Sequence, residues 1–210
     1  MTHHDEKASS DRPAGPGLMP AGIEALLNAS GRVDPRLLAR LVETCSEADF
    51  VRFMRRPVLA GLALQAGSLE QRQDGIGVVN QTFVFALHGE EPHESTPEAL
   101  KRAIYPLVKR TDAAGASHIL TIGCISDNDL VIPDMAISKH HAIIEIGPDG
   151  CSIRDRGSTN GTLVNSTPVG AKPLPLKDVD IIAFARYEFF FLTPESLYER
   201  LAITASSPPG

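Results

Sequence analysis

The stretch from residue 105 to residue 192 limits the fold most, because it consists of short apolar runs separated by turn-forming residues. Ile, Val and Phe dominate the runs, and Gly, Asp, Asn or Pro stands between them. In one run Ile153 and Asp155 alternate with Arg154 and Arg156, as residues on opposite faces of a strand do. Regular short strands with turn signals are typical of an antiparallel β-sandwich. The sequence therefore predicts a mainly β domain with the strand segments YPLVKR, SHILTIG, DLVIP, HAIIEIG, CSIRDR, TLVN and DIIAFARYEFFFL.

Two helices are expected ahead of this region. The segment DPRLLARLVETC has Asp34 as its predicted N-cap and Pro35 at its first helical position. Ser46 opens a second helix through a SEAD motif that resembles a capping box, and Pro57 interrupts or kinks that helix. The apolar stripes are expected to pack in a core, with a partner-docking surface as the alternative; they consist of Leu37, Leu38, Leu41, Val42, Phe50, Phe53 and Met54.

These and other patterns divide the chain into four segments. Thr-Pro pairs at 96–97 and 193–194 each predict the start of a short helix beside the sandwich. The stretch 77–87, rich in Val and Phe, predicts one or two strands ahead of an acidic linker. We therefore expect a disordered N-terminus at 1–19, a mostly helical region with a strand and a linker at 20–95, the β-sandwich with its flanking helices at 96–202, and a disordered tail at 203–210.

Charge and cysteine content limit the classes of partner and the compartment. The formal net charge of -6 argues against a nucleic-acid partner, because such binding depends on basic residues that face phosphates. No run approaches the about 20 apolar residues that a membrane helix needs, so we expect no membrane partner. Cys45, Cys124 and Cys151 are scattered along the chain, which fits a reducing compartment and predicts a cytoplasmic protein.

The sequence contains no pattern that predicts catalysis or a bound cofactor. His3–His4 and His140–His141 are adjacent pairs without a matching set of metal ligands. No serine nucleophile motif, phosphate-binding P-loop or kinase signature is present in the sequence. We therefore expect a protein that is not an enzyme and needs neither a cofactor nor a metal.

Three loop segments of the predicted sandwich share an unusual composition. They are IGCISDNDLVIPD, ISKHHA and RGSTNGTLVN; the first and third are rich in Ser, Asn, Asp or Gly, and the second combines a serine with a lysine and two histidines. Their motifs follow one another in the order Gly123, Ser138-x-x-His141, Asn160-Gly161 and VDIIAF. Over residues from about 105 to 192 the sequence thereby resembles the forkhead-associated (FHA) domain, a β-sandwich that binds phosphothreonine.

The resemblance implies a role for individual residues of the loops. Ser138 and Thr159 would contact the phosphothreonine, and Asn160 would hold the main chain of the bound peptide. Lys139 can add a positive charge beside the phosphate, which carries about -1.5 to -2 charges. Structural residues of the binding loops would be Gly123, His141 and Gly161. The implied partner is a phosphothreonine-containing protein or peptide, such as a Ser/Thr kinase or its substrate.

One position departs from the family pattern. The family has a Gly-Arg pair after its second strand, and this arginine grips the phosphate, whereas here the pair is Gly123-Cys124. A cysteine offers neither the charge nor the bidentate fork of a guanidinium. Loss of such a contact removes about 1.5–3 kcal/mol. Phosphate binding is therefore expected to be weakened, and Lys139 or Arg156 would compensate for only part of the loss.

Several alternatives to phosphothreonine binding follow from the same residues. GSTNG is also the composition of an ordinary tight turn, with Gly161 at positive φ. The sandwich could instead be a phosphate-independent scaffold for protein contacts or self-association, which Cys124 favours. A third alternative places the function in the first hundred residues. A fourth has phosphorylated Thr96 or Thr111 bind back to the loops of the same chain.

Overall fold

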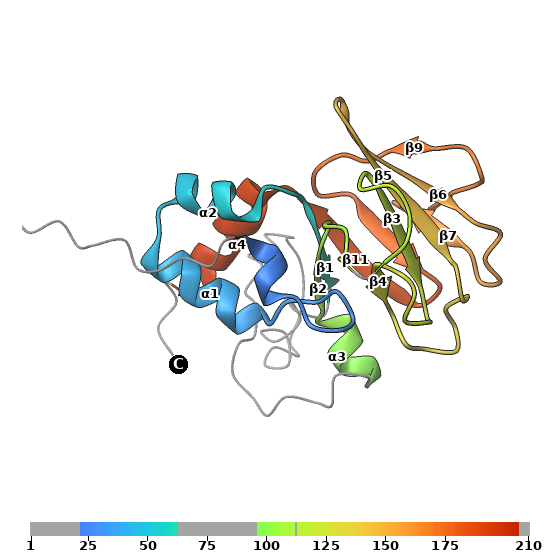
Figure 1. Ribbon diagram of the computed structural model, residues 1–210, viewed down its shortest axis with the longest axis horizontal. Helices are drawn as coiled ribbons and strands as arrows, with labels where there is room; N and C mark the ends of the chain where they lie inside the picture. Colours follow the sequence, from blue (N-terminus) through green and yellow to red (C-terminus); the bar gives the residue numbers. More distant parts are fainter. Residues whose placement is uncertain (1–21, 63–95, 112, 206–210) are drawn as a thin grey trace, which may run out of the picture.

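The computed structural model describes residues 22–62, 96–111 and 113–205, and these form a sandwich of two β-sheets with helices beside it (Figure 1). The helices α1, α2 and α4 gather next to the strands β1 and β11 of one sheet (Figure 1). The predicted mainly β fold, with helices before and after the sandwich, is therefore confirmed. The predicted strands at 77–87 and the predicted disordered N-terminus at 1–19 lie outside the described residues.

In neither sheet do the strands lie side by side in their order along the chain, and nearly all neighbouring strands pair antiparallel. The six-stranded sheet has the order β2-β1-β11-β10-β7-β8, with β1 (Val58–Gly61), β2 (Ile104–Pro106), β7 (Thr162–Val164), β8 (Thr167–Pro168), β10 (Ile181–Phe184) and β11 (Tyr187–Leu192). The five-stranded sheet has the order β4-β3-β5-β6-β9, with β3 (Ile119–Gly123), β4 (Leu130–Val131), β5 (Ala142–Gly147), β6 (Gly150–Asp155) and β9 (Leu174–Pro175). Only β3 and β4 pair in parallel among the strand pairs of the described residues.

The main hydrophobic core lies between the two sheets. Alternation along the strands sends Leu120 and Ile144 inward from the five-stranded sheet, and both are fully buried. Tyr105 and Phe189 meet edge to face from the other sheet, with ring centroids 5.8 Å apart. The Tyr105 hydroxyl donates a hydrogen bond to the carbonyl oxygen of Val131, 2.9 Å away. A buried polar group is thereby satisfied while it ties the sheets together near β4.

The predicted caps are present at the starts of the helices. The Asp34 carboxylate accepts a hydrogen bond from the amide of Arg36 at α1 (Pro35–Thr44), and the Ser46 hydroxyl accepts one from the amide of Asp49 at α2 (Glu47–Met54). The predicted helices after residues 96 and 193 are α3 (Pro97–Lys101) and α4 (Pro194–Ala205). α4 continues through residue 205 and so covers the start of the segment that was expected to be a disordered tail.

A second hydrophobic core lies between the helices and the outer face of the six-stranded sheet. It contains Phe50 and Phe53 of α2, Leu197 of α4 and Phe190 of β11. The predicted apolar stripes therefore pack in a core, except that Leu37 is 39% exposed. Before α1 the chain forms only the short 3-10 helix η1 (Ile23–Leu26) within residues 22–34.

The strand β1 was not predicted from the sequence. Its four residues are all buried, and it pairs with β11 on one side and β2 on the other. The N-terminal region thus supplies a central strand of the sandwich as well as the helices that cover it. The boundary at 95/96 remains a proposal about how the chain is divided.

Candidate functional site

Three loops that follow strands of the five-stranded sheet meet at one end of the sandwich, and the third of them leads to β7 of the other sheet. The 124–129 loop follows β3, the 132–141 loop follows β4, and the 156–161 loop follows β6. Hydrogen bonds connect them: the amide of Cys124 donates to the carbonyl of Ser138 (3.1 Å), and the amide of Thr159 donates to the Ser138 hydroxyl (3.0 Å). The three segments singled out in the sequence therefore form one surface, which we call the loop face.

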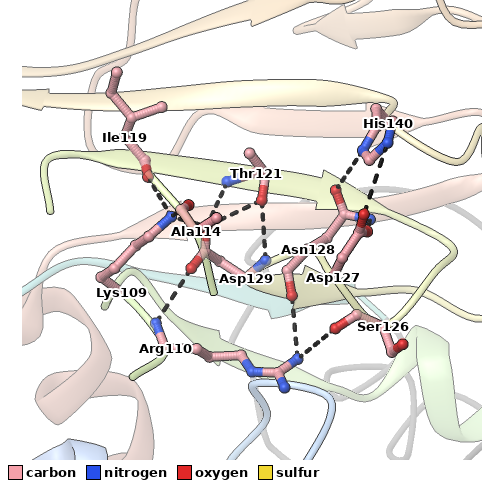
Figure 2. Close-up of polar contacts among 10 residues, drawn as sticks. All are labelled: Lys109, Arg110, Ala114, Ile119, Thr121, Ser126, Asp127, Asn128, Asp129 and His140. Carbon is pink, nitrogen blue, oxygen red and sulfur yellow. Dashed lines mark hydrogen bonds and ion pairs between the residues drawn. The ribbon is translucent and has the colours of Figure 1, made fainter. Parts of the chain in front are cut away.

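Gly123 and Asn128 join the first two loops. The carbonyl of Lys139 lies so close to Gly123 that an added Cβ would sit 2.0 Å from its oxygen, so only glycine fits. Asn128 is fully buried, and its side-chain amide donates to the carbonyls of Lys139 (2.8 Å) and Ile125 (2.9 Å). Its Oδ1 lies 3.4 Å from Nδ1 of His140 (Figure 2). The backbone beside Ser138 is thus fixed from below by a buried amide.

Asp129 fixes the other end of the 124–129 loop. Its buried carboxylate accepts hydrogen bonds from Thr121, through both the amide (2.9 Å) and the hydroxyl (3.0 Å), and forms a 2.8 Å ion pair with Lys109. Arg110 donates its amide to the same carboxylate, and its guanidinium donates to the carbonyls of Ser126 (3.3 Å) and Asn128 (3.1 Å) (Figure 2). Lys109 and Arg110, which lie between β2 and β3, therefore hold the 124–129 loop in place.

His141 connects the 132–141 loop with the 156–161 loop. It is fully buried and packs edge to face against Phe184, with ring centroids 5.7 Å apart. Its Nδ1 accepts a hydrogen bond from the Ser138 amide (3.1 Å), so the hydrogen on the ring belongs on Nε2, which donates to the carbonyl of Gly161 (3.1 Å). One ring therefore sets the distance between the loop of Ser138 and the loop of Thr159.

Asp155 holds the 156–161 loop in place. Its carboxylate accepts hydrogen bonds from the amides of Gly157 (2.7 Å) and Ser158 (2.8 Å) and from the hydroxyls of Ser158 (2.7 Å) and Thr162 (2.6 Å). Burial opposes the charged form, but these bonds outweigh it and lower the pKa of the Asp155 carboxyl. Gly161 ends the loop at φ 77°, a conformation that favours glycine.

Polar groups from two loops are brought together on the loop face. The hydroxyls of Ser138 and Thr159 lie 3.5 Å apart, although 21 residues separate them in the chain. Asn160 is exposed, and one hydrogen of its amide bonds to the carbonyl of Ala136 (2.8 Å), so this bond does not use the second hydrogen or the amide oxygen. Lys139, next to Ser138, is exposed and adds a positive charge.

Cys124 lies beside this group but turns toward the protein interior. Its amide bonds to the Ser138 carbonyl, while its half-buried side chain packs against the core between the sheets. The backbone of residue 124 is therefore hydrogen-bonded to that of Ser138, and an arginine at position 124, as in the family pattern, would start from this point. Arg156, the other candidate for compensation, is exposed and donates its amide to the carbonyl of His141 (3.0 Å).

A salt-bridged anchor holds the outer part of the 132–141 loop. The carboxylate of Asp134 accepts hydrogen bonds from Arg186 and from the Tyr187 hydroxyl (2.7 Å), and it also accepts the amide of Ala136 (2.8 Å). Burial favours the neutral acid, yet the bonds from Tyr187, Ala136 and Arg186 lower the pKa of Asp134. Met135 projects between these fixed residues and is 101% exposed.

Sequence reasoning missed the residues that support the loops from below. Asn128 and Asp129 were assigned no role from the sequence, and Asp155 was placed only on the same strand face as Ile153. All three are buried and fully engaged in hydrogen bonds. The signal that could have found Asp155 is its place on the buried face of an alternating strand, because a buried carboxylate needs partners.

Two further observations concern other classes of site. Within residues 22–62, 96–111 and 113–205, no three His, Cys, Asp or Glu side chains are arranged to hold a metal ion. In the same part of the chain, no helix combines the length and the apolar character needed to cross a bilayer.

Known proteins resemble the sandwich and its loops. The family model described as FHA domain matches residues 120–185. The ABC transporter ATP-binding/permease protein Rv1747 of Mycobacterium tuberculosis is 41% identical over 70 residues, which are 33% of this chain and 8% of the transporter. The glycogen accumulation regulator GarA of the same species is 30% identical over 92 residues, covering 41% of this chain and 56% of GarA. The chain thus spans a small part of one relative and about half of the other.

Among solved structures, Mycobacterium tuberculosis EmbR in complex with low affinity phosphopeptide is 31% identical, with 37% of this chain and 20% of that chain covered and a TM-score of 0.35. The stretch that the family model matches starts in β3 and ends directly after β10. It therefore contains all three loops of the loop face, and it is this stretch of the chain, residues 120–185, that matches the forkhead-associated (FHA) domain family.

Proposed function

We propose that the loop face binds phosphothreonine in a partner protein and that the chain is a non-enzymatic adaptor in Ser/Thr kinase signalling. One observation carries the proposal: Ser138, Thr159 and Asn160 come from two separate loops and converge beside the exposed Lys139. Convergence of donors from different loops is what a bound phosphate requires. An ordinary tight turn at 157–161 would not need contacts to the 132–141 loop.

The proposed roles follow from these contacts. The Ser138 hydroxyl accepts the Thr159 amide, so its hydrogen can turn from Thr159 Oγ1 to a phosphate oxygen without loss of the first bond. The Lys139 ammonium adds charge at short range. Asn160 is held by Ala136 and can pair with the main chain of an extended peptide through its remaining groups. Gly123, His141 and Gly161 keep the loops at the required distance.

The remaining features of the proposed function rest on composition. The net charge of -6 favours a protein partner over a nucleic acid, and the three unpaired thiols fit the cytoplasm. The kinase and the phosphorylated partner belong to this proposal only as chemical classes: a Ser/Thr kinase or one of its substrates.

A titration of the full chain with a degenerate phosphothreonine peptide library tests the proposal. We expect the phosphorylated library to bind and the unphosphorylated library of the same composition to bind at least about tenfold more weakly, which corresponds to about 1.4 kcal/mol. Thr159→Val should weaken binding, whereas Thr167→Val, which replaces an exposed threonine of β8, should not. Equal affinity for the two libraries would refute the proposal.

A phosphate-independent scaffold is the second candidate, and the inward packing of Cys124 favours it. Cys124→Arg distinguishes the two. Where the other phosphate contacts are intact, a new bond from the guanidinium contributes about 1.5–3 kcal/mol, or about ten-fold to more than a hundred-fold in affinity. If Cys124→Arg folds but leaves both peptide libraries unbound, the scaffold is the better account.

A further inference from the structure

The turn at residues 28–32 in the N-terminal region reaches the base of the loop face. The Asn28 side chain shapes it, because its oxygen accepts the amides of Ser30 (2.9 Å) and Arg32 (3.0 Å). The Ser30 carbonyl then accepts the amide of Val131 (3.1 Å) and so covers the outer edge of β4. Figure 1 shows this blue segment, between η1 and α1, running toward β4. Hence the N-terminal region contacts the five-stranded sheet as well as the helical side of the sandwich.

Gly31 packs tightly on the residue that fixes the 124–129 loop. It is buried at φ 77°, and a Cβ added there would lie 2.3 Å from the carbonyl oxygen of Asp129 and 3.7 Å from Cδ of Arg110. No other atom could be placed at that point without moving the Asp129 backbone. The turn thus packs against Asp129 and Arg110, two of the residues that hold the 124–129 loop in place.

From this contact a continuous set of bonds leads to the loop face. Arg110 donates to the carbonyls of Ser126 and Asn128, and Asn128 donates to the carbonyl of Lys139 (Figure 2). The Lys139 carbonyl is also the group against which Gly123 packs. A displacement at Gly31 therefore reaches the backbone beside Ser138 through two buried or half-buried side chains.

We propose that the 28–32 turn is a positioning element of the phosphothreonine site: it holds Asp129 and Arg110, and through Asn128 it sets the backbone at Lys139. This inference rests on the proposed function for its effect on binding, although the positioning itself does not. It assigns the N-terminal region a role in recognition without any contact to the ligand. The matched FHA segment begins at residue 120, so this support lies outside it.

Gly31→Ala in the full chain is the test, with Gly150→Ala as its matched control. Both glycines have positive φ, but an added Cβ at Gly150 meets nothing within 4 Å. Coupling through such contacts changes affinity by about 0.5–2 kcal/mol, so Gly31→Ala should bind the phosphothreonine library about two- to thirty-fold more weakly. Gly150→Ala should bind like the wild type, even if its melting temperature falls as far as that of Gly31→Ala.

A second readout separates this inference from the proposed function. In amide NMR spectra of the free protein, Gly31→Ala should shift the signals of Asn128 and Lys139, and Gly150→Ala should not. If the wild type binds neither library, the proposed function fails, but these shifts still decide the positioning role. A folded Gly31→Ala with wild-type affinity or with unmoved amides overturns the inference.

Arg110→Met tests the positioning role if Gly31→Ala does not fold. It removes the guanidinium bonds to Ser126 and Asn128 and keeps the backbone bond to Asp129. Its expected effects are the same shift at Lys139 and the same two- to thirty-fold loss of affinity, estimated as about 0.5–2 kcal/mol. Arg40→Met, on the exposed face of α1, is the control. Unchanged amides in Arg110→Met would overturn the inference as well.

Discussion

Replacement of Asp155 by alanine should destabilise the protein and disorder the loop that carries Thr159 and Asn160. The substitution removes a carboxylate that accepts four hydrogen bonds of 2.6–2.8 Å. The Thr162 hydroxyl is the most affected donor, because its residue is 1% exposed and water cannot take the place of the carboxylate. The donors of Gly157 and Ser158 are nearer the surface, so water can satisfy them in part.

The expected loss follows from these two environments. A buried donor left without an acceptor costs about 1–3 kcal/mol. Each bond to the surface-near donors contributes less than its charge-assisted maximum, and together they add about 1 kcal/mol. The free energy of unfolding should therefore fall by about 2–4 kcal/mol, which for a protein of this size lowers the melting temperature by about 4–16 °C. Asp155→Asn keeps one acceptor oxygen and should cost about half as much.

Urea and thermal unfolding, followed by circular dichroism, measure this loss. The order of stability should be wild type, then Asp155→Asn, then Asp155→Ala. Thr162→Val serves as a control, because it removes the buried donor and preserves the shape of the side chain. A melting temperature of Asp155→Ala within about 2 °C of the wild type would refute the assignment of Asp155 as the main support of this loop.

Other predictions concern the loop face and its acid stability. Gly123→Ala should lower the free energy of unfolding by about 1–3 kcal/mol, because its Cβ would overlap the Lys139 carbonyl, whereas Gly170→Ala, with nothing within 4 Å of its added Cβ, should be neutral or slightly stabilising. Met135→Ala should leave stability within about 0.5 kcal/mol of the wild type but lower affinity for phosphothreonine peptides with apolar neighbours by about fivefold, or about 1 kcal/mol; equal losses for peptides with charged neighbours would contradict this. Because the folded pKa of Asp155 lies below its unfolded value of about 3.9, its contribution is present above that pH and disappears as the pH falls through the folded value. Stability curves of the wild type and Asp155→Asn should therefore converge below about pH 4, and a constant difference down to pH 2 would contradict the assignment.

Local signals in the sequence predicted much of the fold. The alternation of Ile153 and Asp155 with arginines identified β6, and the caps at Asp34 and Ser46 marked the starts of two helices. These features depend only on neighbours within a few residues, so the sequence displays them directly. The strand β1 shows no alternation because all of its residues are buried, and its assignment depends on partners more than 40 residues away.

The sequence indicated the exposed residues of the candidate site but not the buried residues that hold them in place. The order of Ser138, Thr159 and Asn160 in their motifs indicated where a ligand would bind. Their mutual distances depend on Asn128 and Asp155, whose hydrogen bonds join residues that are close only in the folded chain. The sequence likewise gave no sign that a turn at 28–32 would lie against Asp129, since that contact bridges about a hundred residues.

The most direct test of the proposed function is an amide NMR titration of the full chain with a phosphothreonine peptide library and with its unphosphorylated counterpart. The phosphorylated library should shift the amides of Ser138, Lys139, Thr159 and Asn160 and leave that of Thr167 in β8 unchanged. The unphosphorylated library should shift none of these signals at the same concentration. Shifts that are equal for the two libraries, or that fall outside the loop face, would contradict phosphothreonine binding at this site.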